Sequence, residues 1–190
     1  MKSKFHTKIE NTSNRIIVHM NPKFELLPLP ITRFDDPFLP FSKEIISATG
    51  DIVAGYLFDF ASYLVMGGAG VVALERAIAY VPDNCVTILH APFTGTGYSP
   101  MADATGFNLD AITVATHNDL QHYTENIPYM AFLADDASIP DRGGIYHKGE
   151  LVFKQDDVVT RLSLTTDDIL YTSKLDNFAQ KVREGIQTLQ

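Results

Sequence analysis

TILHAPFTGTGYSP, residues 87–100, is the stretch from which the expected fold follows. An apolar helical pattern at 71–81 stops at Pro82 shortly before it, and the β-branched run DAITVAT at 110–116 comes after it. Inside the stretch, the strand pattern at 86–91 gives way to a loop rich in glycine and threonine. The order helix, strand, loop, strand is typical of a parallel sheet with helical crossovers.

The same alternation covers most of the chain. Strand patterns are expected at 15–21, 52–59, 86–91, 111–116 and 128–134, and helical patterns at 41–51, 61–66, 71–81, 101–105 and 119–124. The rhythm then changes, because IYHKGELVFK predicts a hairpin around Lys148 and Gly149. A last strand at 158–164 and an amphipathic C-terminal helix follow. We expect one domain over residues 1–190, with residues 1–14 as a flexible arm.

Composition excludes several classes of partner. The 190 residues are 45% hydrophobic and carry a net charge of −8, which fits one ordinary domain with a sizeable core. Lysine and arginine form no cluster, so a nucleic-acid partner is not expected. No apolar run approaches a membrane span, and the N-terminus lacks the apolar core of a signal peptide. With Cys85 as the single cysteine, we expect a cytoplasmic protein without a membrane partner.

The wording of whole segments carries a resemblance to a known family. SKEIISATGDIVAGYLFDFASYLVMGGAGVVALERAIAYVP, TILHAPFTGTG, DAITVAT and ILYTSKLDNFAQKVREGIQTL together resemble orotidine 5'-monophosphate decarboxylase of the bacterial type. The resemblance implies an α/β fold of the (β/α)8 TIM-barrel type, a homodimer, and a site at the C-terminal ends of the strands. Because such barrels run to about 250 residues, we expect an incomplete barrel. A hairpin would replace the βα units between strands five and eight.

The positions that carry the family's chemistry hold other residues in this chain. The resemblance places the family's Asp-x-Lys-x-x-Asp motif on His90, Pro92 and Gly95, the lysine of strand two on Leu57, and the aspartate of strand one on Asn21. Protonation of a developing carbanion needs a positioned proton donor. Neither Pro92 nor Leu57 has an ionisable group, so the decarboxylation is expected to be absent.

Phosphate binding is expected to be lost as well. The family grips the substrate phosphate with a glycine-rich loop after strand seven and an arginine after strand eight. The sequence shows no such loop, and the arginine position falls on Asp167. A carboxylate at this place repels a phosphate group.

Other polar residues are expected at the vacated mouth of the barrel. Strand alternation points His19, Asn21 and His117 inward, and the family resemblance places His90 and Asp59 at the same mouth. Three alternatives stay open: a divalent-metal site with His90, His117 and Asp59 as candidate ligands, an acid–base site with the same three as catalytic residues, or polar groups that only bond to one another or to water. The sequence implies no cofactor.

The loop after the third strand offers a second group of ligand-binding candidates. Backbone N–H groups and hydroxyls of Thr94, Gly95 and Thr96 can cradle an anion, but we favour a plain flexible turn for this loop. With His19 and Asn21 they form the predicted ligand-binding set.

Two classes of function follow from these observations. In the first, the chain is a non-catalytic binding or interaction protein built on the decarboxylase scaffold. In the second, it is a repurposed lyase, isomerase or hydrolase that acts on a small polar molecule.

Overall fold

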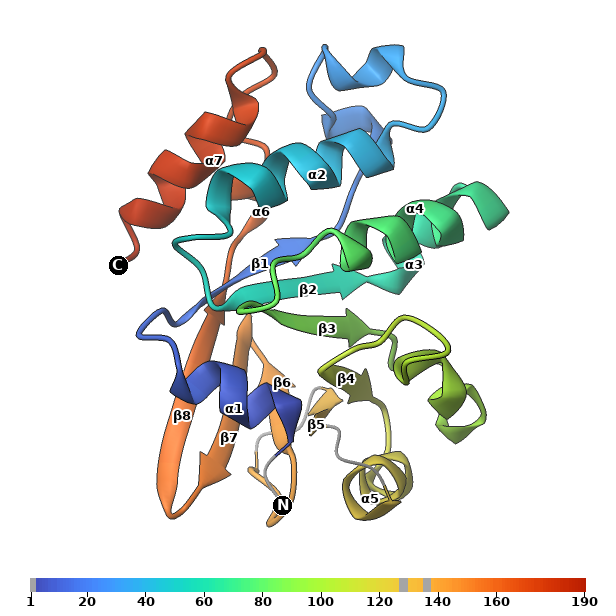
Figure 1. The fold of residues 1–190 in the computed structure, drawn as a ribbon, viewed down its shortest axis with the longest axis vertical. Coiled ribbons are helices and arrows are strands. Elements are labelled where there is room, and N and C mark those ends of the chain that lie inside the picture. The colour runs from blue at the N-terminus through green and yellow to red at the C-terminus, as the bar shows by residue number, and fades with distance from the viewer. Residues whose placement is uncertain (1–2, 127–129, 135–137) are drawn as a thin grey trace.

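A closed barrel of strands forms the centre of the molecule (Figure 1). The computed structural model describes residues 3–126, 130–134 and 138–190. Within these ranges the strands are β1 (Ile16–Met20), β2 (Gly55–Asp59), β3 (Val86–His90), β4 (Ala111–Val114), β5 (Met130–Ala134), β6 (Gly144–His147), β7 (Glu150–Gln155) and β8 (Val158–Leu164). Neighbours from β1 to β6 run parallel, β7 is antiparallel to β6 and β8, and β8 returns parallel to β1.

Helices cover the barrel mainly along its parallel strands. They are α1 (Lys4–Glu10), η1 (Phe24–Leu26), η2 (Ile31–Arg33), α2 (Phe38–Thr49), α3 (Phe60–Leu64), α4 (Gly68–Ala79), η3 (Thr96–Ala102), α5 (His117–Asn126), α6 (Asp167–Leu170) and α7 (Phe178–Gln187). Among the described residues, none of these helices has the length and apolar character that a bilayer crossing requires. The α/β alternation predicted from the sequence is confirmed; residues 128 and 129 of the expected fifth strand lie outside the described residues.

The sheet closes, so the expectation of an incomplete barrel is wrong for the strands. The predicted hairpin is present as β6 and β7, and β8 completes the ring by pairing Leu164 with Ile17 of β1. Two-residue turns join β6 to β7 and β7 to β8, which keeps this part of the barrel compact. Lys148 and Gly149 in the first turn and Asp156 and Asp157 in the second all have positive φ, which matches type I′ hairpin geometry. Three short strands therefore bridge the gap that longer βα units fill in a complete (β/α)8 barrel.

The side chains of the strands form two apolar layers. The interior of the barrel is filled by Ile17, Leu57, Val86, Ile88, Ala111, Met130, Phe132, Leu151, Phe153 and Leu162. The alternate residues of β1, which are Ile16, Val18 and Met20, pack outward with the helices. The predicted alternation of β1 is confirmed, and it turns His19 and Asn21 toward the inside.

Helix α1 closes the N-terminal end of the barrel, so the prediction of a flexible arm is wrong. Phe5 is 0% exposed and its ring meets Phe132 and Phe153 edge-on at centroid distances of 5.4 and 5.3 Å. Lys8 reaches from the same helix to buried Asp110, with Nζ 2.6 Å from Oδ2. The sequence analysis missed these contacts because residues 1–14 are mostly polar. A short helix can dock with only one apolar face.

Candidate ligand site at the barrel mouth

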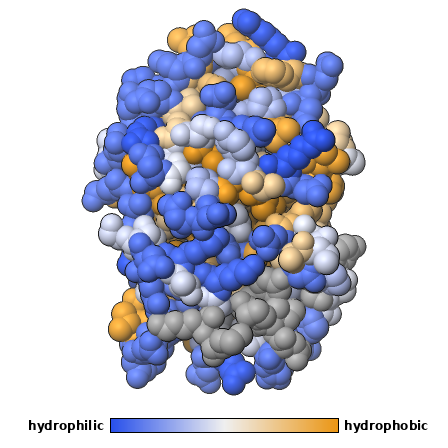
Figure 2. All heavy atoms as spheres, in the orientation of Figure 1, coloured by the Kyte–Doolittle hydropathy of each residue, from blue (hydrophilic) through white to orange (hydrophobic). Residues whose placement is uncertain are grey.

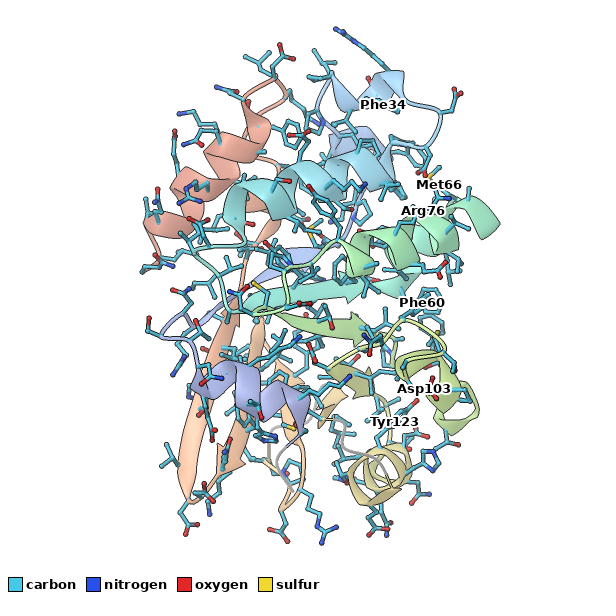
Figure 3. All side chains as sticks on the ribbon, in the orientation of Figure 1. Phe34, Phe60, Met66, Arg76, Asp103 and Tyr123 are labelled. Atoms are coloured by element: carbon cyan, nitrogen blue, oxygen red, sulfur yellow. The ribbon has the colours of Figure 1, made fainter. Side chains whose placement is uncertain are left out.

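The mouth is formed by the residues at the C-terminal ends of β1, β2 and β3. His19 pairs with Leu57 in the strand register, and Asp59 pairs with His90. Figure 3 labels Phe60, which directly follows Asp59 at this end of β2. The parallel register thus gathers His19, Asp59 and His90 at one end of the barrel, as the sequence predicted.

His90 is held by its neighbours on β4 and β6. Its Nδ1 lies 2.8 Å from Thr113 Oγ1, within hydrogen-bond distance, and its ring meets that of Tyr146 edge-on at a centroid distance of 5.0 Å. The Thr113 hydroxyl oxygen also accepts a hydrogen bond from the Ala91 N–H at 3.2 Å. These contacts fix the orientation of the imidazole inside the mouth. Tyr146 escaped the sequence analysis because a hairpin residue shows no sign of its partner across the barrel.

His19 is a largely buried imidazole inside the mouth. Its backbone N–H donates to Thr165 Oγ1 at 3.0 Å, and its Nε2 is buried without a hydrogen-bond partner among the described residues. Burial lowers the pKa of His19 below its ordinary value; the charge of Asp59 opposes this shift, and that of His90 adds to it. Burial therefore favours the neutral form of His19.

A polar cluster occupies the position where the family resemblance places the phosphate-binding arginine. Asp167, in the first turn of α6, accepts a hydrogen bond from Asn21 Nδ2 at 3.0 Å and forms an ion pair with Lys23 Nζ. Burial raises the pKa of Asp167, but the hydrogen bonds from Lys23 and Asn21 outweigh it and leave the pKa below its ordinary value. Tyr171 donates to the Asn21 carbonyl at 2.8 Å and anchors the loop after β1. The Lys23 ammonium beside Asp167 is therefore already paired with this carboxylate.

Asp59 ends β2 and begins α3. Its Oδ1 accepts a hydrogen bond from the Ser62 N–H at 3.2 Å, so it acts as the N-cap of this short helix. Leu57, two residues earlier, is 0% exposed and belongs to the apolar interior of the barrel. The residue that the family resemblance places at the lysine position is therefore part of the core.

His117 does not join the other candidates. The sequence analysis extended the alternation of the fourth strand to this residue, but β4 ends at Val114 and α5 begins at His117. His117 is exposed, beside a cap in which Thr116 Oγ1 donates to Asp119 Oδ2 at 2.7 Å. In the described part of the chain, no three His, Cys, Asp or Glu side chains stand close enough to hold a metal. The candidate set His90, His117 and Asp59 is thus not assembled.

The loop after β3 forms an internally bonded turn. The buried Thr94 hydroxyl donates to the Ala91 carbonyl at 2.8 Å. Gly95 has φ 58°, a conformation that favours glycine, and its carbonyl accepts a hydrogen bond from Tyr123 of α5 (Figure 3) at 3.4 Å. Thr96 is exposed at the start of η3. The Thr94 hydroxyl proton is therefore used inside the turn, which fits the plain-turn interpretation of this loop.

The closed, mostly parallel barrel and the polar residues at its C-terminal mouth define a protein of the TIM-barrel class. No family model matches the chain. It is 30% identical over 138 residues to orotidine 5'-phosphate decarboxylase of Herpetosiphon aurantiacus, covering 68% of this chain and 52% of that protein. It is 28% identical over 134 residues to the enzyme of Flavobacterium johnsoniae, covering 67% and 48%.

Solved structures agree with these relatives. A putative orotidine-monophosphate-decarboxylase from Toxoplasma gondii superposes with a TM-score of 0.58 at 22% identity, covering 71% of this chain and 48% of that one. A putative orotidine 5'-phosphate decarboxylase from Streptomyces avermitilis gives 0.57 at 19% identity, covering 75% and 56%. The chain is a relative of the orotidine 5'-phosphate decarboxylase family, and it spans about half the length of the curated relatives that it matches.

Proposed function

We propose that this chain is a non-catalytic relative of the decarboxylases that serves as a binding or interaction protein. The observation that carries the proposal is the apolar character of the two positions where the family resemblance requires lysine. Leu57 is part of the barrel core, and Pro92 has no ionisable group. Without a proton donor at either place, the chain cannot protonate a carbanion as the family does.

The cluster around Asp167 supports the same proposal. A bound phosphate is stabilised by arginine and by free N–H donors. At the corresponding place this chain has a carboxylate, and the nearby Lys23 is already paired with it. The mouth is thus unsuited to the phosphate that orotidine monophosphate carries.

A direct assay tests the proposal. The purified protein is incubated with orotidine 5'-monophosphate, and decarboxylation is followed by the loss of substrate absorbance, with the Herpetosiphon aurantiacus decarboxylase as positive control. We expect no turnover and no shift of the unfolding temperature by uridine monophosphate. Turnover that copurifies with the protein and scales with its concentration would show that the proposal is wrong.

One observation favours the alternative, a repurposed lyase, isomerase or hydrolase. Asp59 and His90 lie side by side in the strand register, with the imidazole of His19 next to them. Such a set can exchange protons with a small polar substrate. His117 takes no part in this version because it lies on α5 and is exposed.

We also propose that the chain is a cytoplasmic homodimer that associates next to the mouth. Figure 2 shows apolar residues on the side of the molecule where α3 and α4 lie. Val65 and Phe93 are 71% and 60% exposed, and Phe93 stacks on Phe60 with ring centroids 5.8 Å apart. Exposed apolar residues of this size are typical of association surfaces. Light scattering of the wild type and of Val65→Asp would show a dimer and a monomer.

A further inference from the structure

Asn21 has a buried hydrogen-bond acceptor, its amide oxygen Oδ1, at the mouth of the barrel. This side chain is 8% exposed, and its Oδ1 has no hydrogen-bond partner in the described ranges. The orientation of the amide is determined, because Nδ2 donates to Asp167 and a carboxylate can only accept. Oδ1 must therefore be the atom that lacks a partner, and a buried acceptor without a donor costs free energy. A ligand with N–H groups would satisfy it.

The carboxylate of Asp59, next to Asn21 in the strand register, has no lysine or arginine ion pair among the described residues. The register between β1 and β2 pairs Met20 with Phe58, so its next step brings Asn21 alongside Asp59. Asp59 Oδ1 accepts one backbone hydrogen bond, from Ser62, and across the described chain no Lys or Arg forms an ion pair with it. The extrapolated register therefore places two acceptors next to each other, one just after β1 and one at the end of β2, and the second is a carboxylate.

His19 and the charge balance of the protein also bear on the kind of ligand that the mouth can hold. The buried Nε2 of His19 also lacks a hydrogen-bond partner among the residues described. In the tautomer that carries the proton on Nδ1, Nε2 is a further acceptor. Lys23 is paired with Asp167, so the Asp59 carboxylate has no lysine or arginine partner among the described residues. The protein as a whole carries a net charge of −8, which attracts cations and repels anions.

From these contacts we infer that the barrel mouth binds a small organic cation, whose ammonium group donates hydrogen bonds to Asn21 Oδ1 and to the Asp59 carboxylate. The inference rests on the proposed function as a binding protein and gives the chemical class of its ligand. The expected ligand is positively charged, whereas the orotidine 5'-phosphate in the decarboxylases' name is negatively charged. In this chain a phosphate group would lie near the carboxylates of Asp59 and Asp167, which repel it. His19 and the ring of Tyr146 supply the less charged part of the site.

Two probes of equal charge separate hydrogen bonding from simple attraction. Propylammonium carries N–H donors, whereas tetramethylammonium has the same charge and none. Binding is measured by ligand-observed NMR and by the shift of the unfolding temperature, with inorganic phosphate as the anionic probe. We expect propylammonium to bind at least tenfold more tightly than tetramethylammonium, and phosphate not to bind.

A matched pair of variants assigns the site. Asp59→Asn removes the charge but keeps the helix cap, because asparagine caps a helix as well as aspartate. Asp83→Asn makes the same change on an exposed residue that precedes β3, at the opposite end of the barrel. Asp59→Asn should weaken propylammonium binding at least tenfold, and Asp83→Asn should leave it unchanged.

Several results would overturn the inference. These are equal affinity for both ammonium probes, tighter binding of phosphate, no binding of propylammonium, or an unchanged affinity in Asp59→Asn. The outcome is independent of the turnover assay. If orotidine monophosphate is not consumed and propylammonium does not bind, the ligand class is wrong while the non-catalytic proposal stands; if turnover occurs, the proposed function itself has failed.

Discussion

Substitution of Phe5 by alanine is the sharpest test of the closed barrel end. Helix α1 places this ring against Phe132 and Phe153 in the barrel interior, where it is 0% exposed. If residues 1–14 were a flexible arm, the change would have no measurable effect on the free energy of unfolding. If the helix closes the barrel, a large cavity must open beneath it.

The magnitude follows from the burial of the ring. Removing a fully buried phenylalanine side chain costs about 3 to 5 kcal/mol, which includes the transfer of the ring and the cavity left behind. Edge-to-face pairs such as those with Phe132 and Phe153 contribute about 0.5 to 1.5 kcal/mol each beyond the buried area. We therefore expect Phe5→Ala to lower the free energy of unfolding by about 3 to 5 kcal/mol.

Urea denaturation followed by circular dichroism measures this loss. The midpoint should fall while the slope stays the same, because a domain of this size that unfolds in two states exposes the same surface. Phe34→Ala is the matched control, since Phe34 is 54% exposed (Figure 3) and should cost less than about 0.5 kcal/mol. A loss below about 1 kcal/mol for Phe5→Ala would refute the docking of α1.

Two further predictions concern buried polar groups. Because burial lowers the pKa of His19, the folded state resists protonation, so this residue's contribution to stability is present above the unfolded pKa of about 6.5 and is lost as the pH falls below it. The difference between the urea midpoints at pH 7.5 and pH 5 should therefore be smaller in His19→Gln than in the wild type. The control variant His117→Gln should show the wild-type difference. An unchanged difference in His19→Gln would contradict the burial of the His19 imidazole. Asp110 is 2% exposed and accepts hydrogen bonds from both the N–H and the hydroxyl of Thr87, so Asp110→Ala should cost about 2 to 4 kcal/mol in urea unfolding. The exposed Asp83→Ala should cost less than about 0.5 kcal/mol, and equal losses in the two aspartate variants would show that the buried network has no special role.

Local patterns in the sequence were sufficient for the strands and for part of the site. The alternation in β1 correctly turned Ile17 and His19 inward, because a strand has a period of two wherever it is paired. The same rule failed at His117, since β4 ends three residues earlier and helical geometry takes over. A period can be read from the sequence, but the residue at which it stops depends on tertiary pairing.

The contacts that decide the chemistry of the mouth join residues far apart in the chain. Asp167 meets Asn21 and Lys23, and His90 meets Tyr146, although nothing near these residues in the sequence indicates their partners. The sequence did place a negative charge where the family resemblance puts the phosphate-binding arginine. Only the structure shows that this charge is paired with Lys23 and that Asp59 has no lysine or arginine partner in the described part of the chain.

The sequence by itself determined the α/β class, the hairpin before the last strand, and the absence of lysine at positions 57 and 92. These properties follow from side-chain type and local periodicity, which need no knowledge of distant contacts. The tertiary structure alone decided that the barrel closes, that α1 docks at its N-terminal end, and that Asn21 Oδ1 is buried without a hydrogen-bond partner among the described residues. Closure, docking and hydrogen-bond satisfaction are properties of pairs of groups, and those pairs exist only once the chain has brought distant residues together.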